Sequence, residues 1–309
     1  MLGRVARSWW LRLGITAAIL VYLGSRLDMA AAGRAILTVS RPHLAVVLLL
    51  VGLDRLVMIL RWLLLLRASG TPISAKSAAW IFLVSSFVGS FLPAGVGGDA
   101  ARAWTLTQRT AQGSEALASV AVDRLLGILS LVGMGAAGLL LVAPAGDGDW
   151  RLPAAVALLA AICLCAFWAD RLVRAIVPAH RHEGAITRRL LRLSDAVSRY
   201  RGRGGVLVHV MAWSLVVQLL RIGQAYLLGL GLGITVPFRF YLLFMPVGLL
   251  MLLLPVSISG FGLPQGVFVW LLRPLGVPDE ASFALSTLIV LTGLAGNLPG
   301  LVLWLRARR

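Results

Sequence analysis

The sequence predicts an all-α polytopic membrane protein with about six full transmembrane helices and two re-entrant broken helical elements. Hydrophobic residues make up 59% of the 309 residues and charged residues only 13%, and the mean hydropathy is +0.91. Several apolar runs approach the roughly 20 residues that cross the hydrocarbon core of a bilayer. Two other runs are shorter and end in segments rich in proline and glycine, where a helix is expected to break.

The formal charge of +17 comes almost wholly from arginine, because Lys76 is the only lysine. Most arginines fall in loops and at helix ends, where they orient a membrane protein and attract anionic lipid headgroups, so membrane lipids rather than nucleic acid are the expected partners. Cys163 and Cys165 lie two apart in one apolar run, and the four histidines are scattered. We therefore expect no disulfide framework, no metal site and no cofactor, and the oligomeric state stays open.

The amino-terminal segment allows two interpretations. Three arginines precede an apolar run at 13–23, as in a signal peptide, and Ala30 would suit a cleavage site. Trp9 and Trp10 prefer the membrane interface and favour a retained first helix instead.

Five further apolar runs predict complete spans, at about 43–66, 117–142, 153–168, 206–232 and 283–305. The interrupted elements lie at about 80–108 and 240–272. A basic segment, 170–205, carries nine arginines and joins two halves, 43–169 and 206–305, of a single membrane domain covering 1–309. Its apolar side chains around 186–200 recur at helical spacing, which fits either a helix on the anionic leaflet or a linker helix packed on the bundle.

This arrangement satisfies the positive-inside rule. With both termini in the cytoplasm of a cell inner (plasma) membrane, every basic cluster faces inward if the two interrupted elements enter from opposite sides. Arg61 and Leu92 precede Arg221 and Leu254 by 160 and 162 positions, a weak repeat that chance could also produce. Inverted repeats with broken helices near the midplane are typical of transporters.

The interrupted elements supply the candidate substrate-binding site, because broken backbone at membrane depth is tolerated only where protein buries it or where it lines a watery cavity. Arginines inside the apolar runs add partners for an anion. The candidate residues are Arg61, Pro93, Gly95, Gly97, Gly98, Asp99, Arg102, Asp123, Arg124, Arg221, Ser257, Ser259, Gly260, Gly262 and Gln265.

The same residues resemble the lysylphosphatidylglycerol synthase transmembrane-domain family, also described as flippase-like integral membrane proteins. The likeness rests on FLPAGVGGDAARAWTL at 91–106, on Arg61 with Trp62, on 118–125, and on PVSISGFGLPQGVFVWLL at 255–272. It implies movement of polar or aminoacylated lipids, or lipid-linked intermediates, between leaflets. The second motif departs from the family, which often has an acidic residue after an arginine where this chain has Pro264 and Gln265. The soluble aminoacyl-transferring domain of some relatives is not matched, so lipid aminoacylation is not expected.

The four candidate arginines would bind the lipid phosphate, since a charge crossing the low-dielectric core must stay paired. Several residues also allow structural roles. Asp99 would suit a helix N-cap, Arg102 could reach the cytoplasmic interface, and the adjacent Asp123 and Arg124 need partners on other helices. Asp54 lies two turns before Arg61 and could balance an arginine or carry a proton.

Two other function classes stay open. A small-solute or ion transporter would share the broken helices. A membrane-embedded lipid-modifying enzyme would need a nucleophile beside a base, and no such pair accompanies the motifs, so the chain is not expected to be an enzyme.

Overall fold

The computed structural model describes residues 21–71, 73–92, 97–110, 113–142, 157, 161, 195–251 and 261–307. Within these ranges the regular structure is helical, as predicted. Four stretches of the described chain are long and apolar enough to cross a membrane: α3 (Arg41–Ser69), α6 (Gly113–Val142), α10 (Gly204–Gly231), and α13 (Asp279–Ala295) taken together with α14 (Leu298–Arg306). The other two predicted spans lie almost wholly outside the described residues.

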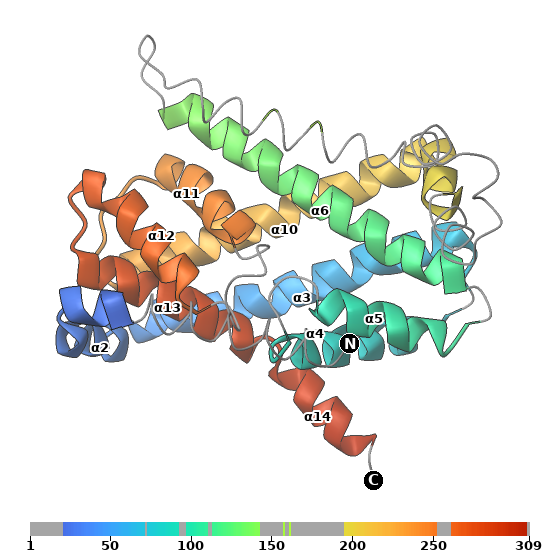
Figure 1. Ribbon diagram of the computed structural model, residues 1–309, viewed down its shortest axis with the longest axis horizontal. Coiled ribbons are helices and arrows are strands. Elements are labelled where there is room, and N and C mark those ends of the chain that lie inside the picture. Colours follow the sequence, from blue (N-terminus) through green and yellow to red (C-terminus); the bar gives the residue numbers. More distant parts are fainter. Residues whose placement is uncertain are drawn as a thin grey trace.

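The long helices form an elongated bundle. Figure 1 shows α3 and α10 running beside each other along its length, with α6 crossing them. Only 17–33% of the most apolar window in each span is buried inside the protein. Leu49, Leu140 and Trp270 are among the large apolar side chains that point outward. Such an apolar exterior is expected when lipid, not water, surrounds a helix.

Both interrupted elements fold as short helical hairpins. In the first, α4 (Ala75–Gly89) and α5 (Gly97–Thr107) meet at Gly89 and Gly98, where a Cβ on Gly89 would lie 2.4 Å from Cα of Gly98. The second pairs α11 (Phe238–Met251) with α12 (Leu263–Leu272) through the rings of Phe244 and Phe268, whose centroids are 5.5 Å apart. At 1.5 Å per residue, none of these helices is long enough to span a hydrocarbon core of about 30 Å.

The two hairpins open at opposite ends of the bundle (Figure 1). The first opens where α3 ends and α6 and α10 begin. The second opens where α3 begins and α10 ends, an end fixed by the Ser40 amide, which donates to the Gly231 carbonyl at 3.1 Å. Re-entrant placement of the hairpins in a bilayer stays a prediction.

The last predicted helix, about 283–305, is interrupted. It breaks at Gly296 and Asn297 into α13 and α14, and the Asn297 amide donates to Ser90 Oγ at 2.9 Å. Gly300 lets α14 approach α4 so closely that a Cβ there would lie 2.1 Å from the Leu83 carbonyl oxygen. The break therefore directs α14 onto the first hairpin.

An additional helix, α2 (Met29–Leu37), occupies the segment considered for signal cleavage. It begins because Asp28 caps it, its carboxylate accepting from the Ala31 amide at 2.9 Å.

The end of the basic segment packs on the bundle. Val197 and Tyr200 are buried, and the Tyr200 hydroxyl donates to the Leu65 carbonyl at 3.1 Å. Burial raises the pKa of Tyr200, which keeps this donor protonated. This contact favours the packed linker helix for 195–200, while residues 186–194 lie outside the described part of the chain.

Candidate functional site

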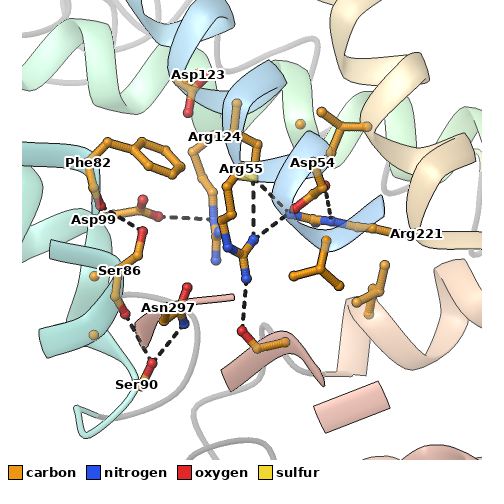
Figure 2. Close-up of a pocket in the computed structure, with 18 of the residues that line it drawn as sticks. Asp54, Arg55, Phe82, Ser86, Ser90, Asp99, Asp123, Arg124, Arg221 and Asn297 are labelled. Atoms are coloured by element: carbon orange, nitrogen blue, oxygen red, sulfur yellow. Dashed lines mark hydrogen bonds and ion pairs between the residues drawn. The ribbon is translucent and has the colours of Figure 1, made fainter. Parts of the chain in front are cut away.

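A cavity of about 430 Å³ lies in the middle of the bundle, beside the tip of the first hairpin (Figure 2). Its volume falls within the range of small-molecule and cofactor sites. The charged residues of the described chain that line it are Asp54, Arg55, Arg61, Asp99, Arg102, Asp123, Arg124 and Arg221. All six charged residues of the predicted site line this cavity: Arg61, Asp99, Arg102, Asp123, Arg124 and Arg221.

Asp123 is the centre of the first group of ion pairs. Its Oδ1 accepts from Nε and Nη2 of Arg61 at 2.9 and 2.8 Å, and its Oδ2 accepts from Nη2 of Arg102 at 3.1 Å. Arg61 also donates to Ser214 Oγ at 3.0 Å. These contacts supply the partners on other helices that the sequence required for Asp123, and they tie α3, α5, α6 and α10 together.

Arg102 lies inside the protein and does not reach the interface. It is only 4% exposed, its guanidinium carbon lies 5.0 Å from the centre of the Trp62 ring, and it is paired with both Asp99 and Asp123. The alternative of a snorkelling arginine is wrong, because three helices and an aromatic face enclose the side chain.

Asp99 is not an N-cap, since α5 begins two residues earlier at Gly97. From the first turn its Oδ1 accepts from Arg102 at 2.9 Å, and its Oδ2 lies 3.4 Å from Nε of Arg124 (Figure 2). The carboxylate stabilises the positive end of α5 and also holds two arginines at the cavity wall.

A second group of ion pairs centres on Asp54. Its Oδ2 accepts from Nη1 of Arg55 at 2.8 Å and its Oδ1 from Nε of Arg221 at 3.1 Å (Figure 2). The other Arg55 nitrogen, Nη2, donates to the Gly293 carbonyl at 3.1 Å. Among the described residues, Nη2 of Arg221 donates only to the Met58 sulfur, at 3.0 Å, a weak acceptor that an anion could replace. Asp54 thus balances arginines, as one of its predicted roles requires, but they are Arg55 and Arg221 instead of Arg61.

The lining is positive overall. The described residues contribute five arginines and three aspartates, a formal excess of two positive charges. Burying such charge in a low-dielectric interior is costly unless it is paired. The cavity therefore favours an anion that can approach the arginines.

Neutral polar side chains complete the lining. They are Ser85, Ser86, Ser90, Gln218, Gln224 and Asn297. Gln218 donates through Nε2 to the Gly127 carbonyl at 3.3 Å and to Ser130 Oγ at 3.2 Å. These groups let the cavity bind hydroxyl and amide groups as well as charge.

Of the two described glycines in the first motif, only one lines the cavity. Gly98 lines the cavity, whereas Gly97 packs on Leu92, where a Cβ would lie 2.2 Å from the leucine Cβ. Pro93 and Gly95 lie outside the described residues.

The described part of the second motif has a structural role. Gly262 has a φ of +93°, and its amide donates to Oε1 of the buried Gln265 at 2.7 Å, which caps α12. Neither residue lines the cavity. Ser257, Ser259 and Gly260 lie outside the described residues.

Several polar lining residues were not among the candidates, and Arg55, Gln218 and Asn297 are three of them. Arg55 and Gln218 carried the same signal as Arg61, a polar side chain within an apolar run. Gly296 followed by Asn297 is typical of a helix break. The apolar residues on both sides instead favoured one continuous helix.

Within the described ranges, no group of three or more histidine, cysteine, aspartate or glutamate side chains could hold a metal ion. The arginines around each aspartate instead equip the site for an oxyanion.

No curated protein matches the chain significantly. Residues 9–300 match the family described as the lysylphosphatidylglycerol synthase TM region, so the match covers nearly the whole chain. This match confirms the resemblance of the two motifs. The chain, a multi-pass membrane protein, therefore belongs to the lysylphosphatidylglycerol synthase TM region family.

Proposed function

We propose that the protein moves a polar or anionic lipid, or a lipid-linked intermediate, between the leaflets of the cell inner (plasma) membrane. The observation that carries the proposal is the arginine-rich cavity halfway along the bundle, beside the tip of a hairpin too short to span a membrane. A phosphate crossing the hydrocarbon core needs such partners, because an unpaired charge there is strongly disfavoured.

The geometry of the two hairpins supports a transport path. If both are re-entrant, each brings a helix break to membrane depth from its own side, as the broken helices of inverted-repeat transporters do. The amino terminus of α5 at Gly98 lies at the cavity, where its free N–H groups favour an anion. The positive-inside rule orients the end with Lys76 towards the cytoplasm.

The arginines differ in exposure, and this difference assigns them roles. Arg124 and Arg221 are 38% and 25% exposed, so they can contact an incoming phosphate. Arg61 and Arg102 are about 5% exposed and bound to Asp123, so they hold the wall in place. A phosphate would displace Asp54 or Asp99 from the exposed arginine and accept its hydrogen bonds instead.

The test is leaflet exchange in proteoliposomes that contain a trace of phosphatidylglycerol labelled on an acyl chain. Addition of a membrane-impermeant quencher reports the lipid that has moved outward. We expect wild-type protein to accelerate exchange over empty vesicles, and Arg221→Gln and Arg124→Gln to slow it about tenfold, the effect of one charge-assisted hydrogen bond.

The matched control is Arg239→Gln, an exposed arginine outside the cavity, which should exchange like wild type. Unaccelerated exchange by folded wild-type protein contradicts the proposal. So does uptake of soluble sn-glycerol 3-phosphate without lipid exchange, which would identify a solute transporter.

A further inference from the structure

Every carboxylate in the described lining of the cavity is paired with two arginines. Asp54 holds Arg55 and Arg221, Asp99 holds two arginines, and Asp123 holds two. In each case one oxygen faces one guanidinium group and the second oxygen faces the other. A cationic ammonium group entering the cavity would find no free carboxylate in this part of the chain, and five arginines would repel it.

Two neutral acceptors lie in the same lining. Gln218 is 3% exposed, and its Oε1 has no hydrogen-bond partner among the described residues. Its orientation is fixed, because its nitrogen must be the atom that donates to the Gly127 carbonyl. Within the described part of the chain, Oε1 of Gln218 is therefore an acceptor without a donor.

Asn297 repeats this arrangement. Ser90 uses its hydroxyl hydrogen on the Ser86 carbonyl, so Ser90 Oγ must accept, and the Asn297 nitrogen must be its donor. Oδ1 of Asn297 has no partner in the described chain, and Figure 2 shows it pointing away from Ser90, towards Arg124. A buried acceptor of this kind favours a ligand that donates a hydrogen bond.

A ligand that satisfies all of these groups combines negative charge with neutral donors. We propose that the cargo is an anionic lipid whose headgroup joins a phosphodiester to free hydroxyls, as a glycerol or a sugar does. The phosphate binds the exposed arginines, and the hydroxyls donate to Gln218 and Asn297. This inference rests on the proposed function and narrows the class of lipid. It excludes the cationic aminoacylated lipids that the family resemblance implies.

The experiment compares three lipids in the exchange assay: phosphatidylglycerol, phosphatidylethanolamine and lysylphosphatidylglycerol, each labelled on an acyl chain and present as a trace. We expect phosphatidylglycerol to exchange at least tenfold faster than either of the others. Equal rates, or a preference for lysylphosphatidylglycerol, overturn this inference and leave the proposed function standing. Exchange of none of the lipids overturns the proposed function itself.

A charge variant tests the cause of the preference. Gln224 lines the cavity, and its Nε2 has no partner among the described residues. Gln224→Glu adds a carboxylate of nearly the same shape and should lower the ratio of phosphatidylglycerol to lysylphosphatidylglycerol exchange about tenfold. Asn297→Asp, at the break between α13 and α14, should act in the same direction.

Gln224→Met is the matched neutral variant. It removes the amide without adding charge, so its absolute rate should fall while the preference for phosphatidylglycerol persists. An unchanged ratio in both folded acidic variants overturns the electrostatic basis of the inference, as does a ratio that Gln224→Met lowers equally.

Discussion

Arg61 and Asp123, 62 positions apart, form an ion pair in which neither side chain is more than 4% exposed. The pair joins α3 to α6. Because the second oxygen of Asp123 accepts from Arg102 of α5, one carboxylate fixes three helices around the cavity. The same contact that shapes the site thus carries part of the stability of the fold.

Removing that carboxylate should destabilise the protein strongly. Asp123→Ala leaves Arg61 and Arg102 buried without their shared partner, and breaking a buried ion pair from one side costs about 3–5 kcal/mol. We expect a loss of this size in the free energy of unfolding, measured by denaturant titration in detergent micelles.

Two variants check the cause of this loss. Arg61→Met combined with Asp123→Leu removes both charges and should cost less than Asp123→Ala alone. Arg273→Ala breaks a pair between an exposed arginine and Asp279 and should leave the free energy of unfolding nearly unchanged, because solvent screens such pairs. A loss in Arg273→Ala as large as that in Asp123→Ala would show that burial is not the cause.

The tip of the first hairpin should not tolerate a methyl group. In Gly89→Ala the new Cβ would lie 2.4 Å from Cα and 2.7 Å from N of Gly98, so the hairpin must open. Overpacking of this kind costs about 1–3 kcal/mol, and the cavity wall would shift with it. We expect a lower unfolding free energy and slower lipid exchange.

Gly133→Ala is the matched control, because no atom of the described residues lies within 4 Å of its Cβ position in α6. It should be neutral or stabilise by up to about 1 kcal/mol, since alanine favours a helix over glycine. Equal behaviour of the two alanine variants would contradict a close contact at the tip.

Hydrophobic runs were enough to predict the long helices. The helix expected at 43–66 is Arg41–Ser69, and that expected at 206–232 is Gly204–Gly231. A long apolar run predicts a membrane-spanning helix because its side chains must contact lipid, and the run can be recognised in the local sequence alone. They could not predict the break at Asn297, because apolar residues continue on both sides of it.

The site could be predicted only in part. Charged residues inside apolar runs identified Arg61, Asp123 and Arg221, which do line one cavity. The pairing could not be predicted, because it joins Asp54 to Arg221 across 167 positions and depends on how α3 packs on α10. The sequence pattern predicted that α5 begins at Asp99, two residues later than the observed start at Gly97. Asp99 was therefore expected to be an N-cap, whereas it lies within the first turn.

The opposite directions of the hairpins can be tested by labelling. In a variant without Cys163 and Cys165, single cysteines replace Lys76, beside the start of α4, or Arg273, beside the end of α12; both positions are exposed. We expect an impermeant maleimide to label Lys76→Cys only from the cytoplasmic side and Arg273→Cys only from the other side. Labelling of both from one side would contradict hairpins that enter from opposite faces.

Gln265 offers a last prediction, which separates a structural residue from a substrate contact. Gln265→Leu removes the acceptor of the Gly262 amide, and a buried donor left without a partner costs about 1–3 kcal/mol. We expect the unfolding free energy to fall by this amount. Because Gln265 does not line the cavity, the ratio of phosphatidylglycerol to lysylphosphatidylglycerol exchange should stay that of wild type. A changed ratio at unchanged stability would instead return Gln265 to the substrate-binding residues, since only a contact with the headgroup would alter the preference without loosening α12.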